Sequence, residues 1–428
     1  MRLPDNHPQR FVLANEIHAR PQEALHPPAR ASYVAAMVGP DERDREHAHV
    51  AALCERYGAH PPPPETTHFS RDLGAFRVIW ERHTEFSSYT LFRRGSAGRP
   101  FAETAASAVP ADWLAAIPGR TVVAMDAEIV DRAQPMLTAS EIAACFDDNY
   151  VVGAAIGDGA GAVFTDFRIH ADGFGRFLVI DRELSRRQVG RTLQRLFEIE
   201  TYRMMALLAL PIARATGPRV RSMEYELADL TAKLAGGAST DEALLEQLTR
   251  LAANVESAIG ESRYRFGATA AYHDLVNSRI AELREQRLPG TQTIDEFMTR
   301  RLGPAMATCK SVAQRLVELS ERVARANDLL ATRVGIVRER QNQELLASMD
   351  RRARVQLRLQ ETVEGLSIAA ITYYVAGLIG YLAKGLKASG LAVDIDLTVG
   401  VSIPIALVLV ALGVRFLRRS VAKAERAG

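Results

Sequence analysis

Two long apolar runs stand out in the pattern of hydrophobic and polar positions along this chain of 428 residues. The first extends from Val363 to Ala383 with one acidic residue near its start, and the second extends from Leu397 to Val414 without a charge. Each run is close to the roughly 20 residues that a helix needs to cross about 30 Å of hydrocarbon. Because the link between them is short and polar, the pattern predicts a C-terminal two-helix transmembrane hairpin over residues 363–414.

Basic residues flank this hairpin on its outer ends and predict its orientation. The flanking arginines are Arg351, Arg352, Arg354, Arg358, Arg415, Arg418 and Arg419. The connecting loop holds two lysines, with the acidic Asp394 and Asp396 beside them. An excess of Lys and Arg marks the cytoplasmic side of a membrane protein. We therefore expect both flanks, including the basic tail at 415–428, in the cytoplasm and the loop outside.

Residues 1–182 have a different pattern, in which short aromatic and β-branched segments alternate with turn residues. We expect strands at residues 30–38, 67–94, 121–130 and 150–181, with two or three strands in the second range and three in the last. Helices are expected at residues 41–57 and after Thr138, where Glu141 completes a capping box. The pattern predicts an α+β cytoplasmic domain over residues 1–182.

A helical region, predicted over residues 183–362, links this domain to the hairpin. The expected helices are Leu184–Ala215, Arg219–Leu234, Asp241–Ile259, Ser262–Arg287 and one from Thr293 into the first apolar run. Gly303-Pro304 predicts a kink or restart near the beginning of the last helix, because proline cannot donate to the helical ladder. The fold class is thus an α+β cytoplasmic domain, then a long helical stalk and a transmembrane hairpin.

A short heptad pattern occurs in the last helix before the membrane. Its apolar positions are Cys309, Val312, Leu316, Leu319, Val323, Ala326, Leu330 and Val337. Such spacing favours packing of one helix against another, as in coiled coils. Two interpretations stay open: the heptad residues pack against preceding helices of the same chain, or they form a stalk shared between subunits of a homo-oligomer.

Composition argues against several classes of protein. The 53 Lys and Arg nearly balance the 51 Asp and Glu, which argues against a nucleic-acid partner. Cys54, Cys145 and Cys309 form no CxxC pair, so we expect buried small side chains rather than disulfides or a cysteine zinc site. The first residues lack the apolar stretch of a secretory signal, which favours a cytoplasmic body.

Two Glu-x-His pairs are the candidate chemistry. Glu16 and His18, and likewise Glu81 and His83, would share a face in extended segments because side chains alternate with period two. Together they predict a metal or acid–base site if the segments meet. The alternative is that they form salt bridges and hydrogen bonds that fix an N-terminal arm onto the sheet.

The other polar groups give no catalytic signature. Glu198, Glu200, Tyr202 and Arg203 fall at helical spacing and are interpreted as a charged helix face or as paired side chains. The sequence has no GxSxG, HExxH, Walker A or dinucleotide fingerprint. No cofactor is therefore indicated, and an enzyme is the less favoured class.

Three segments carry a family resemblance that covers nearly the whole chain. They are FVLANEIHARP at Phe11–Pro21, GAFRVIWERHTEFSSYTLF at Gly74–Phe92 and VGRTLQRLFEIETYRMMALLALPIAR at Val189–Arg214. These segments resemble a bacterial family of membrane-anchored proteins catalogued as domain of unknown function 3422. The resemblance implies location in the bacterial inner (cell) membrane and brings no activity with it.

The order of domains also resembles the CorA magnesium-transporter superfamily of pentameric divalent-cation channels. Members of that superfamily have Gly-Met-Asn at the outer end of the first span, whereas this chain has Gly377-Leu378-Ile379-Gly380-Tyr381. Asp394 and Asp396 at the outer mouth could concentrate cations.

The leading hypothesis is a membrane-anchored, homo-oligomeric protein without catalytic activity, acting as a scaffold or regulatory body. Its expected partners are the lipid bilayer and further copies of itself. The alternatives are a divergent CorA-like cation channel and a membrane-tethered metal-dependent enzyme that uses Glu16, His18, Glu81 and His83.

Overall fold

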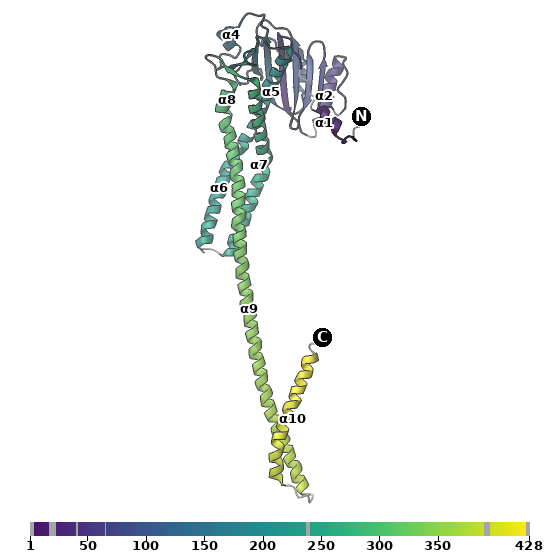
Figure 1. Cartoon of the computed structure of the whole chain (residues 1–428), viewed down its shortest axis with the longest axis vertical. Coiled ribbons are helices and arrows are strands. Elements are labelled where there is room, and N and C mark those ends of the chain that lie inside the picture. Colours follow the sequence, from purple (N-terminus) through teal and green to yellow (C-terminus); the bar gives the residue numbers. More distant parts are fainter. Residues whose placement is uncertain are drawn as a thin grey trace. The chain divides into compact units, whose positions relative to one another are not determined.

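A computed structural model describes residues 4–16, 23–39, 42–64, 66–236, 240–388 and 394–424. The chain forms two compact units, Met1–Asp328 and Leu329–Gly428. The first unit combines a nine-stranded sheet with helices, and the second consists of helical segments (Figure 1). The fold is therefore mixed, as the sequence predicts.

The nine strands lie in the order β2-β3-β4-β1-β5-β8-β7-β6-β9. Their bounds are β1 Ala29–Met37, β2 His68–Asp72, β3 Arg77–Arg82, β4 Phe86–Arg94, β5 Arg120–Val130, β6 Val152–Ile156, β7 Gly161–Thr165, β8 Gly175–Asp181 and β9 Gln286–Arg287. All neighbours pair antiparallel except β5 and β8, which are parallel. The predicted strands are confirmed, and the two-residue β9 adds an edge strand that no sequence pattern indicated.

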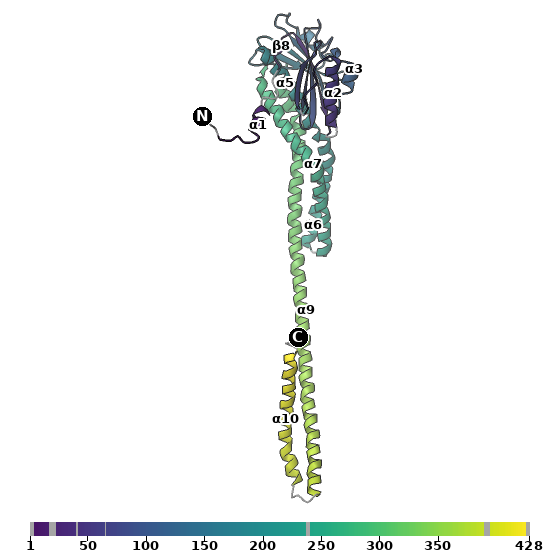
Figure 2. The same cartoon turned by 90° about the vertical axis from the view of Figure 1, so that its right-hand side faces the viewer.

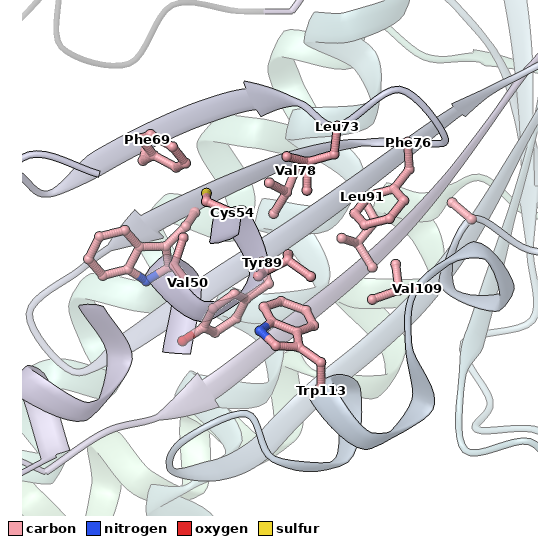
Figure 3. Close-up of a cluster of buried hydrophobic side chains, with 13 residues drawn as sticks. Val50, Cys54, Phe69, Leu73, Phe76, Val78, Tyr89, Leu91, Val109 and Trp113 are labelled. Atoms are coloured by element: carbon pink, nitrogen blue, oxygen red, sulfur yellow. The ribbon is translucent and has the colours of Figure 1, made fainter. Parts of the chain in front are cut away.

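One face of the sheet is covered over β2, β3 and β4 by α2 (Arg43–Arg56) and α3 (Ala111–Ala115). Figure 3 shows Val50 and Cys54 of α2 lying over strand residues such as Tyr89, with Trp113 of α3 beside them. The Tyr89 and Trp113 rings meet edge to face, with their centroids 6.0 Å apart. This cluster buries the apolar side chains that the alternating strands direct to this face.

The opposite face is covered by α5 (Arg186–Leu207). Tyr33 of β1 stacks on Phe197 of α5, with ring centroids 4.7 Å apart. Phe177 of β8 also lies against Phe197, at 6.4 Å. These aromatic contacts fix α5 across the middle of the sheet, where the strands β1, β5 and β8 are neighbours.

Two helices follow α5, and their bounds differ from the predicted ones. The break after α5 lies at Leu208, and α6 then runs from Ala209 to Gly236 through Pro218. Buried residues on both sides of Pro218, Thr216 and Val220 among them, hold that helix together. Tertiary packing there outweighs the hydrogen bond that proline removes.

The next helix, α7 (Asp241–Leu283), is continuous where the sequence suggested a break near residue 260. Ala258 and Ser262 are buried on either side of Gly260. Glycine lowers helix propensity by only about 1 kcal/mol, which such packing offsets.

The remaining helices follow the sequence prediction more closely. The capping boxes at Thr138 and Thr293 begin α4 (Ala139–Ala144) and α8 (Ile294–Arg301). The helix restarts at Gly303 as expected, and α9 spans Gly303–Ala388. At the N-terminus, α1 (Arg10–Glu16) is a helix. The extended conformation assumed for Glu16 is therefore wrong.

The heptad residues at the beginning of α9 are buried within the first unit. Cys309, Leu316 and Val323 are each at most 3 % exposed. Arg315 donates two hydrogen bonds to Glu224 of α6, at 2.9 and 2.6 Å, and Ser320 donates one to Glu256 of α7 at 2.7 Å. Packing against α6 and α7 of the same chain therefore accounts for this part of the heptad pattern.

The second unit contains the rest of α9 and α10 (Ile395–Ala424). Both helices are long and apolar enough to cross a membrane, and their apolar windows are largely exposed, unlike those of a core helix. The two helices cross at an angle in Figure 1 and run alongside one another in the perpendicular view of Figure 2. Gly380 permits their approach, because a Cβ there would lie 3.3 Å from a methyl group of Val399.

Candidate functional site

A cavity of about 240 Å³ lies between the sheet and α5, with one residue of α7 at its edge. Its lining includes three carboxylates, a histidine, a guanidinium and several aromatic rings. The lining residues are Glu23, Tyr33, Ile79, Glu81, His83, Phe86, Ser88, Thr90, Phe92, Gly190, Gln194, Phe197, Glu198, Thr201, Tyr202 and Arg279. Polar groups from distant parts of the sequence thus converge on one space.

The sheet side of the cavity follows from strand alternation. Ile79 and Glu81 of β3 point to this face, and His83 continues the same period just after the strand. Glu81 lies opposite Ser88 of β4 in the antiparallel register. The prediction that Glu81 and His83 share a face is therefore confirmed.

The helix side of the cavity is formed by one stripe of α5. Gln194, Phe197, Glu198, Thr201 and Tyr202 recur at steps of three and four residues, so they lie on one face. A charged face or ion pairs were expected here; Glu198 is paired with Arg279, and Glu198 and Tyr202 also line the cavity. The expected pairing holds for Glu200, which forms an ion pair with Arg203.

Gly190 allows the N-terminal segment to cross α5 at the edge of the cavity. A Cβ on Gly190 would lie 1.8 Å from the carbonyl oxygen of Glu23, so no other residue fits without moving the backbone. The amide of Leu25 donates to the carbonyl of Arg186 at 3.1 Å, and Glu23 pairs with Arg77 of β3 at 2.8 Å. These contacts hold Glu23 at the cavity.

The polar groups inside the cavity are coupled by hydrogen bonds. A hydrogen bond of 3.0 Å joins the hydroxyls of Thr201 and Tyr33, and Thr201 donates to the carbonyl of Phe197 at 2.8 Å. Burial raises the pKa of Tyr33 far above its ordinary value, and the negative charge of Glu81 raises it further. Tyr33 is therefore a neutral hydroxyl at physiological pH.

The guanidinium of Arg279 is shared between carboxylates. It forms an ion pair with Glu198 and a second one with Glu282 at 2.6 Å. Burial acts to lower the pKa of Arg279, but the charges of Glu198 and Glu282 outweigh it and raise the pKa. The positive charge at the edge of the cavity is thus neutralised by the protein itself.

Glu85 has a separate structural role. Its carboxylate pairs with Arg265 of α7 and accepts a hydrogen bond of 2.8 Å from Tyr264. These contacts fasten the β3–β4 turn to α7, which supports the wall of the cavity that carries His83.

Two of the four predicted metal-site residues lie at the cavity, and the other two cannot be placed there. Glu16 ends α1, but its side chain and the whole of His18 lie outside the described residues. Among the residues that the structure describes, no group of three or more His, Cys, Asp or Glu is arranged to hold a metal ion.

The charged residues singled out beside the two apolar runs belong to the second unit. Arg351, Arg352, Arg354, Arg358 and Arg415 are exposed, whereas the side chains of Arg418 and Arg419 are outside the described part. The carboxylate of Asp394 accepts hydrogen bonds from the amides of Asp396 and Leu397, at 3.1 and 3.3 Å. Asp394 therefore caps the beginning of α10.

The sequence predictions also did not include a buried acidic pair on the other face of the sheet. Asp126 and Glu128 of β5 are each 3 % exposed, and Asp126 accepts a hydrogen bond from Ser32. Burial raises the pKa of both carboxyl groups to about 7. The signal was the period-two spacing of two acids inside an apolar strand.

The three cysteines are free and buried, as predicted. Comparison with curated proteins and with solved structures gives no match, and no comparison returns the CorA superfamily. One family model, "Protein of unknown function (DUF3422)", matches residues 5–421. Since that match covers nearly the whole chain, the protein belongs to the DUF3422 family.

Proposed function

We propose that the protein is a membrane-anchored, homo-oligomeric regulatory body that binds a small polar molecule in the cavity between the sheet and α5. The observation that carries the proposal is the convergence of strand, helix and N-terminal residues on this one cavity. Ligand sites typically combine apolar walls with a few placed polar groups, as this lining does.

Binding suits this cavity better than catalysis, because its polar groups are already engaged with one another. Glu198 is paired with Arg279, and Tyr33 is a neutral phenol bonded to Thr201. A general base or nucleophile needs a pKa close to the working pH, whereas burial moves the pKa of Tyr33 away from it. These features favour recognition of a ligand over a chemical step.

The membrane anchor in this proposal is a hairpin formed by the end of α9 and by α10. Two apolar, largely exposed helices support it. The basic flanks favour cytoplasmic N- and C-termini in the bacterial inner membrane. In that orientation the unit that contains the cavity lies in the cytoplasm, where small molecules have access to the cavity.

Self-association is the second part of the proposal. An apolar groove of about 930 Å³ lies between α7 and α9 in the first unit, and Val317 on its lining is 54 % exposed. Leu346 and Met349, further along α9, are 64 % and 59 % exposed. Exposed apolar surfaces of this kind often mark protein interfaces.

The mass of the detergent-purified protein, by light scattering that separates protein from detergent, tests the self-association. We expect two or more copies. A monomer would contradict the homo-oligomer. A pentamer would agree with self-association, would also favour the channel alternative, and would justify ion-flux measurements with Asp394 and Asp396 substituted.

Ligand binding is tested by the melting temperature of the full chain in mild detergent. The probes are ethylammonium, acetate, inorganic phosphate, glycerol and a hexose, and we expect at least one to raise the melting temperature. Ser88→Leu fills the cavity and should abolish the effect, whereas Ser107→Leu at an exposed position should not. Shifts of equal size in both variants, or none with any probe, would contradict the proposed function.

A further inference from the structure

We infer that the cavity between the sheet and α5 selects a small organic cation, an ammonium group held between the Glu81 carboxylate and the surrounding aromatic rings. This inference rests on the proposed function and names the class of ligand. The charges, the rings and the volume of the cavity each support it.

The charges lining the cavity favour a cation over an anion. Three carboxylates, from Glu23, Glu81 and Glu198, line the cavity, and Arg77 beside the lining forms an ion pair with Glu23. The guanidinium in the lining, on Arg279, already lies between Glu198 and Glu282. An anionic ligand would have to displace one of these carboxylates and then lie close to the others, which costs electrostatic energy in a partly buried site.

The negative potential extends from β3 across the cavity to β1. The charge of Glu81 is one of the causes that raise the pKa of Tyr33, whose side chain lies on β1. An ion that enters the cavity over this face of β3, β4 and β1 meets the charge of Glu81. Burial is the larger cause of the Tyr33 shift and acts on any ion, whereas the Glu81 charge acts by sign and would attract a cation.

Aromatic rings form much of the remaining wall. Phe86 and Phe92 of β4 and Tyr202 of α5 line the cavity beside the carboxylates. Aromatic faces attract alkylammonium groups through the ring quadrupole, and they also accommodate the methyl or methylene groups that a metal ion lacks. Rings combined with a carboxylate favour an organic cation over a hydrated inorganic one.

The volume restricts the size of that cation. At about 240 Å³ the cavity is smaller than the roughly 300–1,000 Å³ typical of sites for drug-sized ligands. A ligand of a few heavy atoms around one ammonium group fits this space, and a nucleotide does not.

Calorimetric titration of the full chain in mild detergent tests the inference with shape-matched probes. Tetramethylammonium is compared with neutral tert-butanol, ethylammonium with ethanol, and acetate and Mg²⁺ are titrated separately. We expect both organic cations to bind at least tenfold more tightly than their neutral partners, with acetate and Mg²⁺ not competing.

Variants of the lining residues test whether the cations bind in this cavity. Glu81→Gln should weaken cation binding at least tenfold, and Glu81→Asp, which keeps the charge, should retain the preference for cations. Glu226→Gln, at an exposed position of α6, is the matched control and should leave binding unchanged. Melting temperatures of the variants establish that each is folded, and Tyr202→Leu gives a second, uncharged route to weaker cation binding.

The outcomes separate the two proposals. Equal affinity for tert-butanol and tetramethylammonium, tighter binding of acetate, or competition by Mg²⁺ would overturn the cation inference while leaving ligand binding intact. Cation binding that is unaffected by Glu81→Gln and Tyr202→Leu would also overturn it. Failure of every probe, including the sugar, alcohol and phosphate in the wider panel, would overturn the proposed function as well.

Discussion

At the scale of single residues, Gly190 has a role that its neighbours in α5 do not share. The carbonyl oxygen of Glu23 occupies the space where a Cβ would be, and the obstacle is backbone rather than a flexible side chain. We expect Gly190→Ala to lower the free energy of unfolding by about 3 kcal/mol, at the upper end of overpacking costs. Denaturant unfolding of the purified chain measures the difference.

Gly260 is the matched control for this substitution. It also lies inside a helix, but a Cβ there would meet nothing within 4 Å. Gly260→Ala should stabilise the protein by about 1 kcal/mol, because alanine has the higher helix propensity. Similar effects at both glycines would show that the crossing of Glu23 over α5 is not tightly packed.

Asp126 and Glu128 predict a dependence of stability on pH. Their pKa values are about 7 in the folded chain and near 4 when unfolded, so the folded state binds more protons between these values. The free energy of unfolding should therefore decrease as the pH rises from about 4 to about 7. Melting temperatures measured across this range, for the wild type and for Asp126→Asn with Glu128→Gln, test the sign.

His49 acts in the opposite direction over part of the same range. Burial lowers its pKa from 6.5 to about 4, so stability is lost as the pH falls through this window. Because two acids outweigh one histidine, the wild type should still lose stability as the pH rises from about 4 to about 7, whereas the double variant should lose stability only as the pH falls. A double variant that still loses stability toward pH 7 would contradict the assignment to the two acids.

Some of the candidate site could be predicted from sequence at this scale. Glu81 and His83 alternate along one strand, and period two alone places them on one face. Tyr33 and Arg279 could not be predicted, because strand order and helix packing bring β1 and α7 to the cavity from distant parts of the chain. The prediction that Glu16 and His18 belong to the site is not tested, because the Glu16 side chain and His18 lie outside the described residues.

At the scale of elements, the beginning of α5 determines how the helix side of the cavity is presented. Ser185 and Gln188 form a capping box, in which the Gln188 side chain accepts from the Ser185 amide at 2.8 Å. Ser185→Ala should reduce the free energy of unfolding by about 1 kcal/mol. Ser257→Ala, at an exposed position inside α7, should have a smaller effect in the same unfolding measurement, and equal losses would argue against a capping contribution.

Strands and capped helix starts were predictable because they depend on local spacing and side-chain hydrogen bonds. Helix interiors were less so. Pro218 and Gly260 locally favour a break, but buried neighbours on both sides keep α6 and α7 continuous. The edge strand β9 has only two residues, too few to leave a periodic signal.

At the scale of the whole molecule, the apolar runs and their basic flanks predict a testable topology. In intact cells, a membrane-impermeant maleimide should label Lys387→Cys from outside and should label Arg415→Cys only after permeabilisation. The native cysteines are buried and their thiol pKa values are raised, so the background should be low. External labelling at residue 415 would contradict the proposed orientation.

The heptad pattern illustrates why assembly is harder to predict than folding. The heptad residues at the start of α9 are buried, and hydrogen bonds join this part of α9 to α6 and α7 of the same chain. The same spacing would suit a shared stalk, and hydrophobic spacing does not distinguish a partner helix in the same chain from one in another chain.

The position of β9 in the sequence bears on how the protein is made. The sheet edge at β6 is closed by residues 286–287, which are synthesised long after β8. Roughly 4–15 s then pass before residue 363 is added, at about 5–20 residues per second. Sheets of this kind fold in milliseconds to seconds. The sheet can therefore close before the first apolar run is translated, which would separate folding of this unit in time from the proposed insertion of that run into lipid.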